Sequence, residues 1–149
     1  MAEIGFYHLQ GTALEAALPK LLEKVLASNG RAVVMAGSEE RVEALNTALW
    51  LYHPNSFLPH GSARDGHAPH QPVWITAEDE NPNGANFLVL TDGAVSDNVD
   101  GFERCLEIFD GSDAVAVSAA RARWREYGEK GYVTRYWQQT ETGGWEQKA

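Results

Sequence analysis

The sequence predicts an α/β fold in which a central, largely parallel sheet carries helices on both faces. Runs rich in β-branched and aromatic residues alternate with amphipathic segments at helical spacing, and turn residues separate most of them. The chain has 149 residues, a length typical of one domain that buries roughly two thirds of its unfolded surface. We therefore expect residues 1–149 to form a single domain, with residues 140–149 as a polar tail.

The first half of the chain begins with a strand, a helix and a second strand. Residues 4–9 (IGFYHL) are short and aromatic, as in a strand. Thr12 and Glu15 form the T-x-x-E pattern of a capping box, which predicts a helix start. Pro19 lies inside the apolar run that follows and predicts a kink or a later start. Residues 31–36 (RAVVMA) then predict a buried parallel strand.

A second helix follows directly from the turn at Gly37 and Ser38. The order strand, Gly, Ser, helix is the layout that binds phosphate in many α/β proteins. However, Glu39 and Glu40 occupy the first helical turn, where they suit the helix dipole but would repel a phosphate. Neither G-x-G-x-x-G nor G-x-x-x-x-G-K-[ST] occurs in the sequence. The pattern therefore disfavours a nucleotide site at this turn.

The second half adds strands at residues 73–77 and 86–91 and a last strand at residues 132–139. Asp92 follows the second of these strands, at the position where α/β enzymes often keep a carboxylate. Asp-Gly is also a common turn, so this position alone is weak evidence for a site.

Two more helices are expected between the last two of these strands. The first begins at Asp97 or Asp100 and passes through Phe109. The second occupies residues 112–131, where Ser112 or Asp113 precedes a run of high helix propensity as a candidate N-cap.

The second of these helices carries the most unusual pattern in the chain. At helical spacing, Val117, Arg121, Trp124 and Arg125 share one stripe, whereas Arg123 points to another side. One interpretation is a solvated arginine face with Trp124 in the core. The other is a socket for an acidic peptide with an aromatic end, because arginine grips carboxylates while an aromatic wall receives a ring.

The segment after the second helix is aromatic and rich in proline and histidine. Trp50 and Phe57 either cap the edge of the core or form a surface patch for a partner. His60, His67 and His70 are irregularly spaced on this loop without a supporting cysteine, so the pattern disfavours a zinc site.

Composition excludes several classes of protein. The chain has 12 Lys and Arg against 21 Asp and Glu, a formal net charge of -9, which argues against a large electrostatic grip on nucleic acid. Its single cysteine, Cys105, excludes an intramolecular disulfide and any C-x-x-C motif and is expected in the core. We find no signal peptide and no long apolar run, so we expect a cytoplasmic protein that does not span a membrane.

Four stretches of the sequence point together to one family. They are SEERVEALNTALWLYHPNSFLPHG, PNGANFLVLTDGA, FERCLEIFDGSDAVAVSAARARW and GYVTRYWQQTETGGW. In this order they resemble the chi subunit of bacterial DNA polymerase III. The resemblance implies a Rossmann-like, three-layer α/β/α domain with no enzymatic activity and no cofactor, which is a monomer by itself and an accessory part of the clamp-loader assembly.

The resemblance also implies partners and site residues. Chi subunits bind the acidic C-terminal tail of single-stranded-DNA-binding protein, which ends in phenylalanine. The basic, aromatic and basic positions of the family fall on Arg121, Trp124 and Arg125. A relative can have Tyr or Lys at such positions, and both changes keep the ring and the charge. Val117 would pack beside the phenyl ring of the tail.

A second surface of the family receives the psi subunit, and the match of the ALW–SFLPHG segment places Trp50 and Phe57 there. Two alternatives remain. One is an enzyme that uses a nucleotide or phosphosugar, with Asp92 and the histidine loop at its site. The other is direct binding of single-stranded DNA by Trp124, Trp137 and the arginines.

Overall fold

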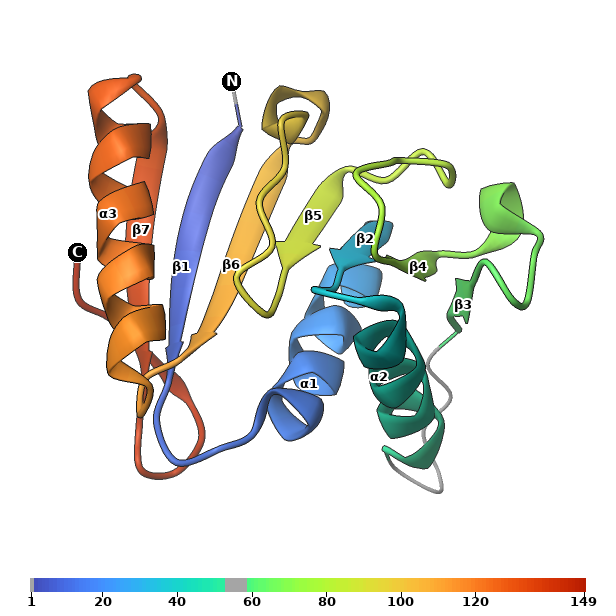
Figure 1. The fold of residues 1–149 in the computed structure, drawn as a ribbon, viewed down its shortest axis with the longest axis horizontal. Coiled ribbons are helices and arrows are strands. Elements are labelled where there is room, and N and C mark those ends of the chain that lie inside the picture. The colour runs from blue at the N-terminus through green and yellow to red at the C-terminus, as the bar shows by residue number, and fades with distance from the viewer. Residues whose placement is uncertain (1, 53–58) are drawn as a thin grey trace.

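The computed structural model describes residues 2–52 and 59–149, which form an eight-stranded sheet in the order β3-β4-β2-β5-β6-β1-β7-β8 (Figure 1). The paired strands are parallel except for β8, which runs antiparallel to β7. The elements are β1 (Glu3–Leu9), α1 (Leu14–Ala27), β2 (Ala32–Met35), α2 (Glu39–Leu51), β3 (Gly61–Ser62), η1 (Ala68–His70), β4 (Val73–Thr76), β5 (Phe87–Leu90), η2 (Val99–Gly101), β6 (Arg104–Asp110), α3 (Ala114–Glu129), β7 (Val133–Gln139) and β8 (Trp145–Gln147).

Helices cover both faces of this sheet. Because side chains alternate along a strand, β2 supplies Val34 to the core under α1 and α2, and Val33 to the core under α3. Figure 1 shows α3 over the strands at one side of the sheet and α1 and α2 over the strands at the other. The prediction of a three-layer α/β fold with a mostly parallel sheet is confirmed.

The predicted helix through Phe109 is wrong. The chain makes the short helix η2 and then the strand β6, which lies between β5 and β1 in the middle of the sheet. Cys105 and Phe109 belong to the core on the α3 side, and Leu106 and Ile108 to the core on the α1 side. A strand buried on both faces shows no simple alternation, so its apolar residues also fit helical spacing.

The ends of the helices follow the sequence only in part. The N-cap of α1 is Ala13, with no side-chain cap, so Thr12 does not form the expected capping box. Pro19 lies inside α1, which begins before it. In α3 the carboxylate of Asp113 accepts hydrogen bonds from the backbone N–H groups of Val115 and Ala116 at 3.0 and 3.3 Å, as predicted for this cap.

The C-terminal residues fold back onto the sheet. Strand β8 pairs with β7, and the ring of Trp145 meets that of Tyr7 edge-to-face with centroids 5.1 Å apart. Lys148 donates its backbone N–H to the carbonyl of Tyr136 at 2.7 Å. These contacts bring the last residues of the chain beside β7. Within the described residues, no helix is both long enough and apolar enough to cross a membrane.

Candidate functional site

Helix α3 holds Trp124 against the sheet through aromatic contacts. The indole ring is half-buried. Its centroid lies 5.6 Å from the ring centroid of Phe6 in β1 and 5.7 Å from that of Tyr136 in β7, and both pairs of rings meet nearly edge-to-face. Such edge-to-face pairs stabilise by about 0.5–1.5 kcal/mol beyond simple burial. Trp124 is therefore anchored in the core and still presents part of its ring to solvent.

A hollow of about 420 Å³ opens beside this ring, and we call it the α3–β7 pocket. It lies where α3, the end of β1, strand β7 and the C-terminal residues meet. Its lining consists of His8, Arg121, Trp124, Tyr136, Gln138, Lys148 and Ala149. The pocket thus combines an aromatic wall with two cationic side chains.

Of the four residues predicted to bind the acidic tail, the structure brings only two together in the pocket. Arg121 and Trp124 both line the α3–β7 pocket. Val117 is half-buried and packs against the core under α3. Arg125 is exposed one turn beyond Arg121 and is not among the residues of the lining.

The charge of Arg121 is not neutralised by a carboxylate within the described residues. The ion pairs there take up Arg41, Arg64, Arg123 and Arg135, but not Arg121, which is exposed. The pocket therefore offers a guanidinium that no ion pair occupies, the group best suited to gripping a carboxylate with two hydrogen bonds.

Two polar rings lie at the base of the pocket. The Nδ1 atom of His8 and the hydroxyl of Tyr136 are hydrogen-bonded at 2.7 Å. Burial lowers the pKa of His8 and the charge of Arg121 lowers it further, although Asp110 acts in the opposite direction. Burial also raises the pKa of Tyr136, against the effect of Arg121. Both rings are therefore neutral at pH 7, so the positive charge of the pocket comes from Arg121 and from Lys148, whose Nζ atom also pairs with the carboxylate of Glu146 at 3.3 Å.

Arg123 has a different role from its neighbours on α3. It forms an ion pair with Glu107 of β6 beneath the helix, and only 2% of Glu107 is exposed. Burial raises the pKa of Glu107, while Arg123 opposes this shift. The sequence showed that Arg123 points away from the stripe, but Glu107 was missed because it sits within an otherwise apolar run.

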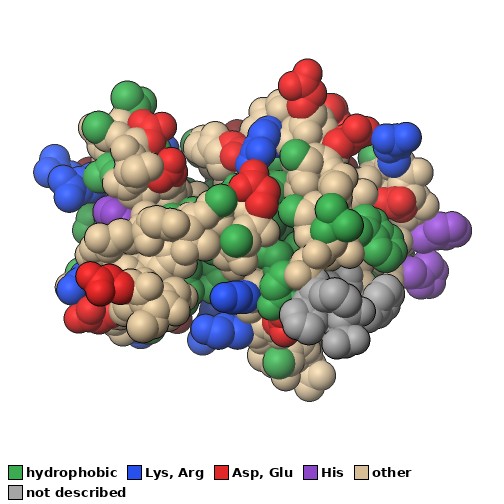
Figure 2. All heavy atoms as spheres, turned by 90° about the horizontal axis from the view of Figure 1, so that it is seen from below, with side chains coloured by type: hydrophobic (Ala, Val, Ile, Leu, Met, Phe, Trp, Pro, Cys, Tyr) green, Lys and Arg blue, Asp and Glu red, His purple; other side chains and the backbone are tan. Residues whose placement is uncertain are grey.

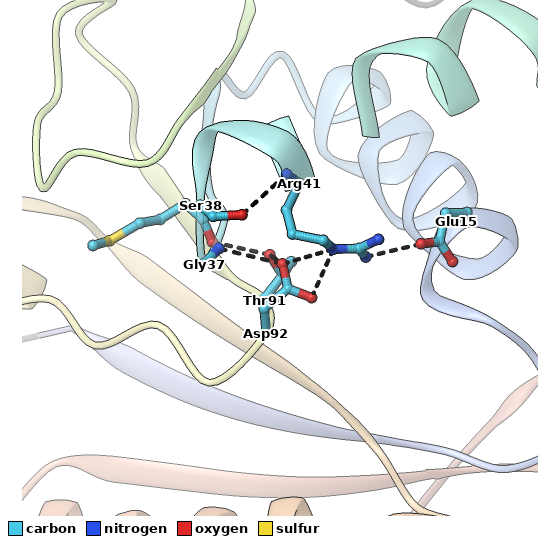
Figure 3. A network of polar contacts seen from close by, with 7 residues as sticks. Glu15, Gly37, Ser38, Arg41, Thr91 and Asp92 are labelled. Atoms are coloured by element: carbon cyan, nitrogen blue, oxygen red, sulfur yellow. Dashed lines mark hydrogen bonds and ion pairs between the residues drawn. The ribbon is translucent and has the colours of Figure 1, made fainter. Parts of the chain in front are cut away.

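The carboxylate of Asp92, which the enzyme hypothesis requires, is already bound by two neighbours. It accepts hydrogen bonds from the backbone N–H of Gly37 at 3.2 Å and from Nε of Arg41 at 3.2 Å. Arg41 also pairs with Glu15 of α1 at 2.8 Å, and Figure 3 shows its guanidinium lying between the two carboxylates. The network ties α1, α2 and the end of β5 together, which gives Asp92 a structural role.

A larger hollow of about 780 Å³ lies at this carboxyl end of the sheet. Two of its lining residues are arginines, Arg41 and Arg123, and both are committed to ion pairs. Its carboxylates are Glu15, Asp92, Asp110 and Asp113. Figure 2 views the molecule from this end and shows Lys and Arg side chains scattered among Asp and Glu. Four carboxylates against two arginines that are already paired make this hollow unfavourable for a phosphate-bearing substrate.

Of the two residues predicted to form a partner surface, Trp50 and Phe57, the structure describes only Trp50. Trp50 lies near the end of α2 with 60% of its surface exposed, next to Leu51 at 77%. Its ring lies 4.8 Å from that of His60. Phe57 lies outside the described residues. In the part of the chain that the structure describes, no three His, Cys, Asp or Glu side chains gather as metal ligands would.

The structure also separates the two tryptophans of the direct DNA-binding hypothesis. Tyr136 and Trp137 are consecutive in β7 and therefore point to opposite faces of the sheet. Trp124 contacts Tyr136, whereas Trp137 lies near Tyr7 on the other face. The two indoles cannot share one nucleic-acid site.

Five residues that line the α3–β7 pocket carry no signal in the sequence, among them His8, Tyr136 and Lys148. The strands that carry His8 and Tyr136 were predicted, and alternation places both on the same face once the two strands are paired. That pairing joins residues more than a hundred positions apart, and no local pattern specifies it.

Comparison with known proteins identifies the family of the chain. The sequence model of the family described as "DNA polymerase III chi subunit, HolC" matches residues 1–135. A relative from Rickettsia prowazekii (strain Madrid E), named "Probable DNA polymerase III subunit chi", is 37% identical over 90 residues, which are 60% of this chain. The match spans about half, 54%, of that relative. The chain belongs to the DNA polymerase III chi subunit family.

Proposed function

We propose that this protein is a non-catalytic accessory subunit of the DNA polymerase III holoenzyme that binds the acidic C-terminal tail of single-stranded-DNA-binding protein. Binding would occur in the α3–β7 pocket and tether the clamp loader and polymerase to coated template during replication. The observation that carries this proposal is that Arg121, free of any ion pair within the described residues, shares one pocket with the partly exposed ring of Trp124.

The chemistry of the pocket suits a peptide that ends in phenylalanine. Arg121 and Lys148 would pair with the terminal carboxylate and an aspartate, and the phenyl ring would pack beside Trp124 and Tyr136. Arg125 lies outside the lining, where an exposed charge steers an acidic tail more than it holds it. Two charge-assisted hydrogen bonds of roughly 1.5–3 kcal/mol each and one buried ring are consistent with a micromolar complex, about -8 kcal/mol.

Fluorescence anisotropy tests the proposal directly. A labelled peptide with the last residues of the cognate single-stranded-DNA-binding protein is titrated with the protein at low and moderate salt. We expect saturable binding that weakens with salt. A peptide without the terminal phenylalanine is the control and should bind much more weakly. Absence of binding at high protein concentration would remove the proposed function and leave the fold unaffected.

The variant Arg121→Ala should weaken tail binding by about 1–3 kcal/mol, since it removes a charge-assisted hydrogen bond in the pocket. Arg64→Ala is the matched control, because it removes the same charge from an exposed side chain that pairs with Glu43 on the surface. Equal affinities for the two folded variants would contradict the assignment of the pocket.

The exposed end of α2 supports a second part of the proposal, contact with psi or another clamp-loader component through Trp50. An exposed tryptophan beside an exposed leucine is typical of a binding surface. The test is co-purification of clamp-loader proteins with Trp50→Ala and with Arg121→Ala. We expect the first variant alone to lose them, and retention by both would contradict this surface.

A further inference from the structure

The sheet face opposite α3 is only partly covered over β1, β7 and β8. In Figure 1, α1 and α2 lie over the strands at the other side of the sheet. Tyr7, Trp137 and Trp145 project from these three strands on the side away from α3, and all three are only partly buried, with Tyr7 and Trp145 packed against the edge of the core under α1. We call this surface the open face.

The aromatic rings of the open face are arranged around Tyr7. The planes of Tyr7 and Trp137 differ by 12°, with centroids 6.3 Å apart, so the two rings present nearly parallel faces. Trp145 meets Tyr7 edge-on at 5.1 Å. The ring of Tyr7 also lies over Gly5, because a Cβ atom there would be 3.0 Å from it. A glycine at this position leaves room for the ring to lie along its strand.

Cationic side chains surround these rings. A hollow of about 430 Å³ on the open face is lined by Lys24 of α1, Arg104 of β6 and Arg135 of β7, together with Tyr7 and Trp137. Its one carboxylate is Glu3, which is paired with Arg135. Within the described ranges, Lys24 and Arg104 form no ion pair, and both are exposed. This excess of positive charge is local, since the whole chain has a formal net charge of -9.

We propose that the open face is a contact site for single-stranded DNA. Unstacked bases would stack on the rings of Tyr7 and Trp137, while Arg104 and Lys24 would pair with the phosphates on either side. Partly exposed aromatic rings flanked by cations are the arrangement that binds single strands without reading their sequence. Duplex DNA does not fit, because its bases are stacked on one another and cannot meet the rings.

This site is independent of the α3–β7 pocket. The two surfaces lie on opposite sides of β7, where Tyr136 faces one and Trp137 the other. With so few cations the open face alone binds weakly. If another contact holds single-stranded DNA close to the protein, the effective concentration of that DNA at the open face is raised and binding is strengthened.

The test measures binding of a fluorescein-labelled oligothymidylate about 12 nucleotides long at low salt. The test variant is Lys24→Glu with Arg104→Glu, and the control is Arg64→Glu with Lys130→Glu. Both double variants change the net charge equally and alter exposed side chains. Circular dichroism confirms that each is folded. Ultraviolet cross-linking followed by mass spectrometry then identifies the residue in contact with a base.

We expect the wild type and the control to bind and the test variant to bind about tenfold or more weakly. The slope of log affinity against log salt should become shallower by about 0.7 for each phosphate that the test variant no longer neutralises. Cross-links should form at Tyr7 or Trp137, and Arg121→Ala should leave oligonucleotide binding unchanged while it weakens binding of the tail peptide. No binding at low salt, an equal weakening in the control, or cross-links at Trp124 would each overturn the proposal.

Discussion

At the scale of single residues, His8 gives the α3–β7 pocket a charge that depends on pH. Burial, followed by the nearby charge of Arg121, lowers its pKa below the ordinary value of 6.5. His8 is therefore neutral in the free protein at pH 7. An acidic ligand favours the protonated form of His8 and therefore raises its pKa. Lowering the pH below 7 protonates His8 and so strengthens binding of the ligand.

We expect the affinity for the acidic tail peptide to rise between pH 7 and about pH 5.5, where the peptide carboxylates are still ionised. Substitution of His8 by Gln keeps a polar group at this position and should flatten the dependence. The measurement is anisotropy across this pH range. His70→Gln, at an exposed position of the short helix η1, is the control and should keep the wild-type slope. The same slope in the His8 variant would contradict this role.

The ion pair between Glu107 and Arg123 gives a second prediction for single residues. Arg123→Ala would leave the buried carboxylate of Glu107 without its partner and should lower the free energy of unfolding by about 3 kcal/mol. Urea denaturation measures this change. Glu107→Leu combined with Arg123→Met should cost much less, because it removes both charges. Arg125→Ala on the exposed surface should change stability by no more than about 0.5 kcal/mol.

At the scale of helices and strands, both α1 and α3 have a capping residue predicted from the sequence, but only one of the two residues caps its helix in the structure. Asp113 caps α3 through its side chain, whereas Thr12 does not cap α1. Asp113→Ala should therefore cost about 1 kcal/mol of stability, and Thr12→Ala should cost clearly less. Urea denaturation of the two variants compares them directly. A larger loss from Thr12→Ala would mean that its hydroxyl forms the cap after all.

The strands and helices also show which parts of the fold a sequence can specify. Five strand runs and the helix with the Arg121 stripe were predicted, because propensity, capping and spacing are local signals. Strand β6 was mistaken for a helix because burial on both faces removes the alternation that marks a strand. Arg121 and Trp124 were found from helical spacing. Tyr136 and Lys148 were missed as pocket residues because only the paired sheet brings them to α3.

At the scale of the whole molecule, one sheet supports two cores. Val33 lies in the core under α3 and Val34 in the core under α1 and α2, although they are neighbours in β2. Unfolding of either core would expose one apolar face of the same strands to solvent. We therefore expect the two cores to unfold together in a single transition.

The prediction is tested by urea denaturation followed both by circular dichroism and by tryptophan fluorescence. The two signals should give the same midpoint. Val33→Ala and Val34→Ala should each shift both signals together, since each leaves a cavity in one core. Separate midpoints for the two signals would show that one side of the sheet unfolds without the other.

The distribution of indole rings over the two faces has a practical spectroscopic consequence. Trp124 reports on the α3 side of the sheet, and Trp137 and Trp145 report on the opposite side. Replacing Trp50, Trp74 and one of these two groups with phenylalanine, while keeping the other group, would make the remaining emission report which face of the sheet a ligand touches. A pair of such variants, one for each face, would then show which of two ligands binds on which side, without an attached dye on the protein.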